Sequence, residues 1–204
     1  MPSGDPFFNL AADEFLMRNS PGEYFILSIN ERSLIIGKHQ LSHRETNTRF
    51  VTENEIPVIR RISGGGTVFH DPGNLNFSFI LNSTEGRQVD FRKYTRPVIS
   101  FLASLGIDAR FEGKSDLKIG GLKISGNAEY VFRNRVLHHG TLLFEADLDF
   151  LRNSIRKDTS NYGSGAVPSN PSPVTNLGGI LKNVAGTERF RDLMLEWFLR
   201  NYPG

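Results

Sequence analysis

The sequence predicts an α+β fold, in which helices flank a mixed, largely antiparallel sheet. Apolar and polar residues alternate along 75–80, which is typical of a strand whose two faces have different surroundings. Gly120 and Gly121 separate two short strand-like segments and predict a two-residue hairpin. Between Phe91 and Leu105, by contrast, apolar residues recur at helical spacing.

In chain order, the first half is predicted to form one helix and then several strands. The expected elements are a helix at 7–17 and strands at 24–29, 33–37, 58–62, 67–70 and 75–81. We expect 24–29 and 33–37 to form an antiparallel pair, because only residues 30–32 connect them.

The second half is predicted to begin with a helix over 91–105, which Pro97 either kinks or starts. Next come the hairpin strands 116–119 and 122–125, strands at 131–132 and 136–144, and a short helix at 147–156. Thr187 is the predicted N-cap of a final helix. The apolar stripe of that helix is expected to pack in the core, or alternatively to cover a partner surface; it consists of Phe190, Leu193, Met194 and Trp197.

Composition predicts a single globular domain over residues 1–204. The chain is 38% hydrophobic and 23% charged, which is sufficient for a core. There is no apolar run near the ~20 residues that cross a bilayer, and no secretion signal, so we expect no membrane partner. A cytoplasmic location is the expectation, with an organelle matrix as the alternative. The net charge of +2 and the scattered basic residues argue against nucleic-acid binding.

The most informative motif is the run from Arg60 to Asp71, in which three adjacent glycines lie between strand-like segments. Glycine is unfavourable inside strands, so the cluster indicates close approach of backbone to a ligand. Exposed N–H groups bind anionic oxygens, and Arg60 and Arg61 also favour an anionic ligand. A tight sheet corner with solvated arginines explains the same residues. The run matches neither a Walker loop nor a dinucleotide-binding fingerprint.

Two further segments place reactive side chains on predicted strands. Lys123 alternates with Leu122 and Ile124, so it is expected to point to the opposite face of the sheet. Taken alone, this lysine is better explained as a solubilising charge. His138 and His139 precede a glycine on another strand, without a cysteine or carboxylate at metal-ligand spacing, so no zinc site is predicted.

Together these motifs resemble the catalytic domain of lipoate-protein ligases. The matching residues are Arg60-Arg61-x-Ser63-Gly64-Gly65-Gly66-x-Val68-x-His70-Asp71-x-Gly73-Asn74, Lys123-Ile124-Ser125-Gly126-x-Ala128 and His138-His139-Gly140-Thr141-Leu142-Leu143. Phe8-Asn9-Leu10-Ala11 and Val174-Thr175-Asn176-Leu177 extend the resemblance across nearly the whole chain. Three motifs in order are far more specific than one glycine loop.

The resemblance implies the fold that lipoyl ligases share with biotin ligases and class II synthetase-like domains. It also implies a reaction that uses ATP, Mg²⁺ and lipoate. The lipoate carboxylate attacks the α-phosphate of ATP, giving lipoyl-adenylate and pyrophosphate. A lysine of a lipoyl-domain acceptor then takes the acyl group and releases AMP. The implied acceptors are the E2 subunits of 2-oxoacid dehydrogenases and the glycine cleavage H protein.

The resemblance further implies roles for individual residues. Lys123 is the expected catalytic lysine, which bridges the substrate carbonyl and the phosphate. Asp116 is expected to contact Mg²⁺ or the ribose, and Asp71 to be structural. His70 is expected in the pocket wall and His139 beside the site. The other expected lipoate- and nucleotide-binding residues are Arg60, Arg61, Ser63, Gly64, Gly65, Gly66, Thr67, Val68, Asn74, Ser125, Gly126, Ala128, Gly140 and Thr141.

Residues 153–173 show no hydrophobic periodicity and contain several glycines and prolines. Such a long loop is usually functional, so we predict a lid that excludes water from the adenylate; simple disorder is the alternative.

Two departures from the family pattern leave alternatives open. Gly113-Lys114-Ser115-Asp116 stands where many ligases have Gly-Arg-Asn-Asp, so the nucleotide contact is either weakened or made by Ser115. Only one helix is predicted after Leu177, so we expect no small C-terminal accessory domain. The alternatives are a transferase that uses preformed lipoyl-adenylate or needs an accessory subunit, and a non-catalytic lipoyl-binding module. The chain has no cysteine, which excludes a thioester intermediate.

Overall fold

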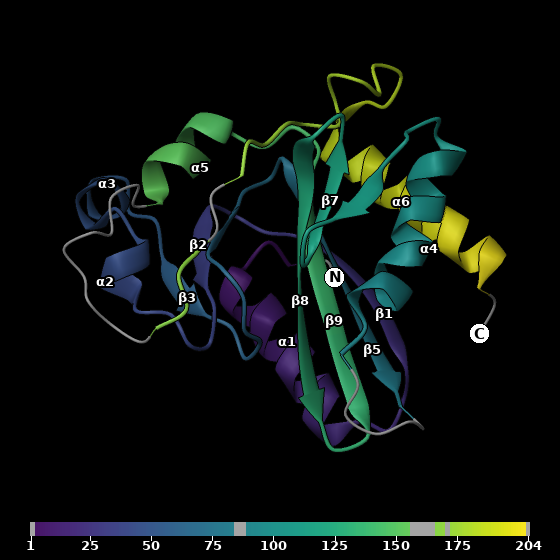
Figure 1. Ribbon diagram of the computed structural model, residues 1–204, viewed down its shortest axis with the longest axis horizontal. Coiled ribbons are helices and arrows are strands. Elements are labelled where there is room, and N and C mark those ends of the chain that lie inside the picture. Colours follow the sequence, from purple (N-terminus) through teal and green to yellow (C-terminus); the bar gives the residue numbers. More distant parts are fainter. Residues whose placement is uncertain (1–2, 84–88, 156–165, 170–171, 203–204) are drawn as a thin grey trace.

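The computed structural model describes residues 3–83, 89–155, 166–169 and 172–202 and contains two sheets (Figure 1). The larger sheet is antiparallel throughout, in the order β1-β5-β9-β8-β7-β6. Its strands are β1 (Tyr24–Ile29), β5 (Asn74–Asn82), β6 (Arg110–Glu112), β7 (Asp116–Ile119), β8 (Leu122–Phe132) and β9 (Arg135–Leu143).

The smaller sheet has three strands in the order β3-β2-β4. Its strands are β2 (Ser33–Ile36), β3 (Val58–Arg60) and β4 (Val68–His70), and the β2–β3 pair is parallel. The predicted α+β class with mixed, largely antiparallel strands is therefore confirmed.

Three long helices cover the larger sheet. In Figure 1, α4 (Phe91–Ser104) and α6 (Gly186–Asn201) lie on one side of it, and α1 (Pro6–Asn19) lies near the smaller sheet. The short helices α2 (Ser42–Glu45), α3 (Thr48–Glu53) and α5 (Leu148–Ser154) gather around the smaller sheet. In the part of the chain that the structure describes, no helix is long and apolar enough to cross a membrane.

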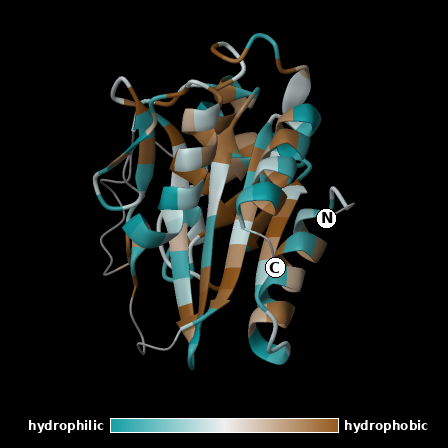
Figure 2. Ribbon diagram, turned by 90° about the vertical axis from the view of Figure 1, so that its right-hand side faces the viewer, coloured by the Kyte–Doolittle hydropathy of each residue, from teal (hydrophilic) through white to brown (hydrophobic). Residues whose placement is uncertain are grey.

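The two faces of the larger sheet differ in chemistry, and Figure 2 shows hydrophobic and hydrophilic bands along its strands. Directly paired residues share a face, because side chains alternate along each strand. One face holds the main core, in which Phe77 and Phe79 pack with Phe101 of α4 and Phe190 of α6. The other face is also buried. Its polar members include Ser28, Asn76, Ser78 and Thr141, and beside them Ile80 and Leu137 pack with Met17 of α1 in a smaller apolar cluster.

Residues 24–29 and 33–37 do not pair, so the predicted antiparallel pair is wrong. β1 pairs with β5, whereas β2 lies between β3 and β4 in the other sheet. The connecting Asn30 is buried, accepts from Asn9 Nδ2 at 2.7 Å and donates to His70 Nδ1 at 3.0 Å. These bonds hold the chain where it crosses from one sheet to the other.

Helix boundaries also correct one detail and decide between two alternatives for another. The final helix begins at Gly186 with Ala185 as its N-cap, so Thr187 lies inside the first turn and does not cap it. The predicted apolar stripe does pack on the core, with Phe190 and Met194 buried. Pro97 lies inside α4, not in its first turn.

Candidate active site

Lys123 and Asp116 form an ion pair at the hairpin of β7 and β8. The Lys123 Nζ lies 2.8 Å from Asp116 Oδ1, and the two side chains are 22% and 16% exposed. The turn between the strands uses Gly120 and Gly121 with φ of 55° and 82°, a region that favours glycine. The predicted two-residue hairpin thus brings the two charged side chains together.

A bulge in this hairpin changes the expected alternation of side chains. The register between β7 and β8 shifts at Leu117 and Lys118. A Cβ added at Gly126 would lie 3.1 Å from Lys123 Nζ, so the lysine extends along the strand over this glycine. Ser125, expected on the Lys123 face, instead accepts from Asn127 Nδ2 at 3.3 Å. Gly126 therefore leaves room for the ammonium group.

The backbone of Lys123 is also held on the edge of β8 that lies opposite β7. Its N–H donates to the Pro173 carbonyl at 2.8 Å, and its carbonyl accepts from Thr175 N at 3.0 Å. Asn176 then bonds both backbone groups of Ala146, at 3.2 and 2.9 Å. The segment 174–177, part of the resemblance but without a predicted role, thus anchors the central lysine.

Arg61 shapes the glycine loop from inside. Its buried guanidinium donates to the carbonyls of Ile35 at 3.1 Å, Gly64 at 2.6 Å and Gly66 at 2.7 Å. Burial lowers the pKa of Arg61 to about 10, so it stays charged at neutral pH. Because the Gly64 and Gly66 carbonyls point toward Arg61, the N–H groups of the loop are free to face elsewhere. Those of Gly64, Gly65 and Gly66 donate to no other described residue.

Arg60 has a similar structural role. Its Nη1 donates to the carbonyls of Gly37, Lys38 and Gln40, at 3.0, 3.2 and 2.7 Å. We predicted that both arginines would point to an anionic ligand; in the structure their guanidinium groups bind backbone carbonyls. For Arg61, the physical reason is that a loop which turns its N–H groups outward must satisfy its inward carbonyls.

The glycine loop also requires glycine on a neighbouring strand end. A Cβ at Gly37 would lie 2.1 Å from the Gly65 carbonyl oxygen, which no side chain tolerates. Gly65 itself has φ of 89°. Gly37 was absent from the predicted site, because a single glycine gives no sequence signal of a close approach.

A polar cluster joins the glycine loop to residues 166–169. Gln40 Oε1 accepts from Thr67 Oγ1 at 2.9 Å, and Thr67 N donates to Ser169 Oγ at 2.9 Å. Ser169 donates in turn to the buried carboxylate of Glu45. Gln40, Glu45 and Ser169 were not predicted. Much of the predicted lid, at 156–165 and 170–171, lies outside the described residues.

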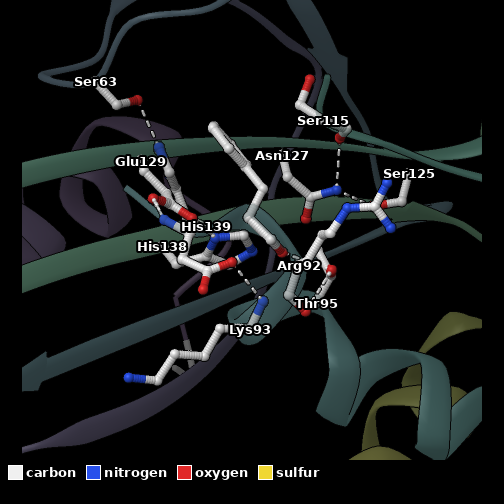
Figure 3. A network of polar contacts seen from close by, with 12 residues as sticks. Ser63, Arg92, Lys93, Thr95, Ser115, Ser125, Asn127, Glu129, His138 and His139 are labelled. Carbon is white, nitrogen blue, oxygen red and sulfur yellow. Dashed lines mark hydrogen bonds and ion pairs between the residues drawn. The ribbon is translucent and has the colours of Figure 1, made fainter. Parts of the chain in front are cut away.

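His139 lies on the polar face of the larger sheet. Its Nε2 is 2.6 Å from Ser63 Oγ, and Figure 3 shows the two side chains pointing toward one another. Burial first, and then the Arg61 charge, hold the pKa of His139 well below its ordinary value. The imidazole is therefore neutral at pH 7 and links β9 to the glycine loop.

The neighbouring His138 points to the opposite face. Its Nδ1 lies 2.9 Å from Glu129 Oε1, and both side chains are buried. Glu129 Oε2 also accepts from Asp90 N at 3.0 Å, at the start of α4. The adjacent histidines thus serve different layers of the molecule.

His70 and Asp71 lie at the end of β4 and form structural contacts. His70 Nδ1 accepts from Asn30, and burial lowers the pKa of His70 to about 3. Asp71 accepts from the backbone N–H groups of Gly73 at 3.0 Å and Asp147 at 2.7 Å. Neither side chain is shown in contact with Lys123.

The remaining predicted residues divide between the site and its support. Gly126 N donates to Thr141 Oγ1 at 3.4 Å, and Ala128 is paired with His139. Asn74 is fully buried and donates to Asn76 at 2.8 Å, while Val68 pairs with Ile35 in the smaller sheet. A Cβ at Gly140 would lie 2.4 Å from Asn127 Oδ1, so this glycine allows close packing.

Asn127 is a further residue that the sequence motifs left unassigned. Its backbone N–H and its Nδ2 both donate to the Ser115 carbonyl, at 3.0 and 2.8 Å (Figure 3). These bonds fix the chain just before Asp116. The Gly-Lys-Ser-Asp segment, in which this chain departs from the family pattern, is therefore held through its backbone.

A cavity of about 180 Å³ lies between α1, residues 59–62 and β9. Its lining includes Leu10, Asp13, Arg61, Leu137 and His139. An open groove of about 410 Å³ lies elsewhere, along residues 42–58, and none of the predicted site residues lines it. The smaller cavity is thus the one that adjoins the predicted site.

Within the described ranges, no three His, Cys, Asp or Glu side chains converge as a metal site. Asp116 is a single carboxylate, and Mg²⁺ typically binds one or two carboxylates together with nucleotide phosphates. The residues present therefore fit a magnesium ion that arrives with ATP.

The two-sheet fold, with a lysine above a glycine-lined polar face, is that of the catalytic domains of lipoate ligases. The chain belongs to the family described as the lipoyl protein ligase A/B catalytic domain, which it matches over residues 5–199. The resemblance noted from the motifs is thereby confirmed.

Two relatives illustrate the match in sequence. Lipoate-protein ligase 1 of Staphylococcus aureus is 39% identical over 194 residues, which cover 94% of this chain and 59% of the relative. Lipoate-protein ligase LplJ of Bacillus subtilis is 40% identical over 193 residues, covering 94% and 58%. The chain therefore spans less than two thirds of the length of these relatives.

Solved structures show the same fold. LipL1 of Plasmodium falciparum, in complex with lipoate, has a TM-score of 0.80 at 26% identity and covers 98% of this chain and 60% of that chain. A lipoate-protein ligase A bound with ATP has a TM-score of 0.81 at 26% identity, covering 97% and 81%. A bipartite ligase from Thermoplasma acidophilum has a TM-score of 0.78 at 27% identity, covering 94% and 77%.

Proposed function

We propose that residues 1–204 form one catalytic domain that activates lipoate with ATP and transfers the lipoyl group to a lysine of a lipoyl domain. The observation that carries this proposal is the position of Lys123, whose ammonium group lies over Gly126 and beside Asp116. The names of the relatives support the same activity.

In the first step, a lipoate carboxylate oxygen bonds to the α-phosphorus of ATP while the bond to pyrophosphate breaks. The Lys123 ammonium would stabilise the negative charge that develops on the phosphate, and its fixed backbone keeps it in place. Asp116 would hold Lys123 and contact a magnesium ion, which neutralises phosphate charge.

The N–H groups of Gly64, Gly65 and Gly66 would supply additional donors to an anionic ligand. The carbonyls of Gly64 and Gly66 accept hydrogen bonds from Arg61, so the loop is held in its shape before a ligand binds. Preorganised donors are the kind that stabilise a transition state without further rearrangement. The cavity beside His139 would receive the acyl chain.

In the second step, the neutral amine of an acceptor lysine forms a bond to the acyl carbon while the carbon–oxygen bond to AMP breaks. The amine loses one proton in this step. We propose E2 subunits of 2-oxoacid dehydrogenases and the glycine cleavage H protein as acceptors.

A transferase that depends on a second chain is the alternative. The names of the relatives and the ATP-bound structure of a lipoate-protein ligase A do not favour it. The Thermoplasma acidophilum ligase is described as bipartite, which is a property of that protein.

The deciding experiment measures lipoate-dependent release of pyrophosphate from ATP without an acceptor protein. Release that is lost in Lys123→Ala and kept in Lys118→Ala supports a self-sufficient ligase. Lys118 is the matched control, because it is the partner of Lys123 across the hairpin but pairs with Glu112. No release, followed by transfer from synthetic lipoyl-adenylate, supports the alternative. Lipoate binding with neither reaction would contradict both.

A further inference from the structure

The carboxyl group of Asp13 lies at the cavity between α1 and β9. Asp13 is 8% exposed, and its Oδ2 accepts from Ser78 Oγ at 2.7 Å. Apolar side chains from α1, from the segment after β3 and from β9 line the same cavity, namely Leu10, Ile62 and Leu137. A carboxyl group in such surroundings is unusual, because burial of its charged form is costly.

The strand register connects this cavity with the proposed reaction centre. Ser78 pairs with His139, and His139 pairs with Ala128 on the same face of the sheet. Gly126 lies two positions along β8 from Ala128, which corresponds to about 7 Å of strand. Lys123 Nζ lies over that glycine. An acyl chain whose carboxylate lies near Lys123 would therefore extend toward Asp13.

We propose that Asp13 marks the inner end of the acyl pocket and takes up one proton when an acyl chain fills the cavity. This inference rests on the proposed function for the identity of the ligand. A hydrocarbon chain removes the remaining water around the carboxyl group, and an unpaired buried carboxylate then protonates in preference to remaining charged.

The charged groups around the cavity do not offset that cost. Asp13 has no ion pair with any described residue, and Glu14 pairs with Arg18. Arg61 and Arg60 face the cavity, but they donate hydrogen bonds to backbone carbonyls and to Ser63. His139 is neutral at physiological pH because its pKa is lowered. Ser78 supplies one hydrogen bond, which a protonated carboxyl group also accepts.

The acid–base chemistry of the open cavity agrees with this geometry. Burial raises the pKa of Asp13 to about 6, although the Ser78 hydrogen bond acts in the opposite direction. Filling the cavity removes more water and raises the pKa of Asp13 further. Above pH 6 the competent, protonated fraction falls about tenfold per pH unit, and apparent acyl affinity falls with it.

The test is calorimetric titration of octanoate and of lipoate, without ATP, at pH 7.5 in two buffers of different ionisation enthalpy. The wild-type protein is expected to take up close to one proton per acyl chain bound. Asp13→Asn keeps the size of the side chain and cannot titrate, so proton uptake should fall to near zero. Its Kd should stay flat from pH 6 to pH 8, whereas the wild-type Kd should rise at least tenfold.

Ser78→Ala provides a second, independent variant. Its hydrogen bond lowers the pKa of Asp13, so its removal should move the rise in Kd to higher pH. Circular dichroism checks that both variants fold, and Ser78→Ala carries the test if Asp13→Asn does not. Equal proton uptake in wild type and Asp13→Asn, or no acyl binding, would overturn the proposal. Acyl binding and proton uptake are measured here without ATP, and pyrophosphate release is measured in the separate assay with ATP. A protein that binds the acyl chain with proton uptake but releases no pyrophosphate would therefore contradict only the ligase function.

Discussion

The two faces of the larger sheet are both buried, but the face under α4 and α6 is mainly hydrocarbon, whereas the other combines hydrogen-bonding groups with a smaller apolar cluster around Ile80 and Leu137. Phe77, Phe79 and Phe101 fill the face under α4 and α6. Across the same strands, Asn76, Ser78 and Thr141 lie beneath α1 and the glycine loop. Burial of polar groups is costly unless they are bonded, so a protein that concentrates them on one face has a use for them there. The main core and the residues proposed to carry the reaction thus lie on opposite faces of one sheet.

The largest effect on stability is expected from the hydrocarbon face. Phe101→Ala removes a fully buried ring that contacts Phe190 and Trp197. We expect a loss of about 3–5 kcal/mol in the free energy of unfolding, measured by urea denaturation. Phe8→Ala on α1, where the ring is exposed, is the control and should change it by less than about 0.5 kcal/mol. Equal losses in both variants would contradict the assignment of the core.

The largest effect on activity is expected from the polar face. Lys123→Ala should lower the rate of pyrophosphate release about 100- to 1,000-fold, because one preorganised electrostatic donor is removed. The midpoint of thermal unfolding should stay nearly constant, since Lys123 is partly exposed and packs in no core. A parallel loss of activity and stability would show that the two faces are not separate.

The carboxyl group on the polar face should make the protein less stable in its charged form. The folded-state pKa of Asp13 is raised from 3.8 to about 6, so folding favours its proton. Its contribution to stability therefore falls as the pH rises from about 4 to 6 and stays low above that window. Asp13→Asn should gain up to about 3 kcal/mol relative to wild type at pH 8 and little at pH 4. Chemical denaturation at both pH values measures the difference.

The smallest of these effects concerns the polar pair on the hydrocarbon face. Glu129→Ala leaves the buried His138 and the N–H of Asp90 without their acceptor. We expect a loss of about 1–3 kcal/mol in unfolding free energy, with kcat/KM of the folded enzyme within about twofold of wild type. A large rise in the KM for lipoate would instead assign Glu129 to the site. It would contradict the separate roles of the two sheet faces.

Several parts of the fold and the site followed from local pattern. The hairpin at Gly120 and Gly121 was predictable because a two-residue glycine turn has few alternatives. The run of three glycines after Arg61 indicated a loop whose backbone approaches a ligand, because glycine is unfavourable inside strands. The pairing of β1 was not predictable, because a short connection favours a hairpin and nothing local shows that the chain changes sheets at Asn30. The long-range hydrogen bonds that decide it join residues far apart in sequence.

The roles of Arg61 and of Gly126 show the same limit within the site. A charged residue beside glycines suggested direct binding of an anion, and only the folded loop shows that its carbonyls occupy the guanidinium. The bulge that places Lys123 over Gly126 depends on the shifted register between β7 and β8. Asp13 carried no motif signal at all, because its significance arises from what α1 packs against.

By itself, the sequence determined the class of fold, the three motifs and the family to which they belong, since these depend on short-range periodicity and on residue types at close spacing. Only the tertiary structure decided which strands share a sheet, which charged groups face a cavity and which satisfy backbone carbonyls. The physical reason is that burial, hydrogen-bond partners and pKa values are properties of neighbours in space, and the chain brings those neighbours together only when it folds.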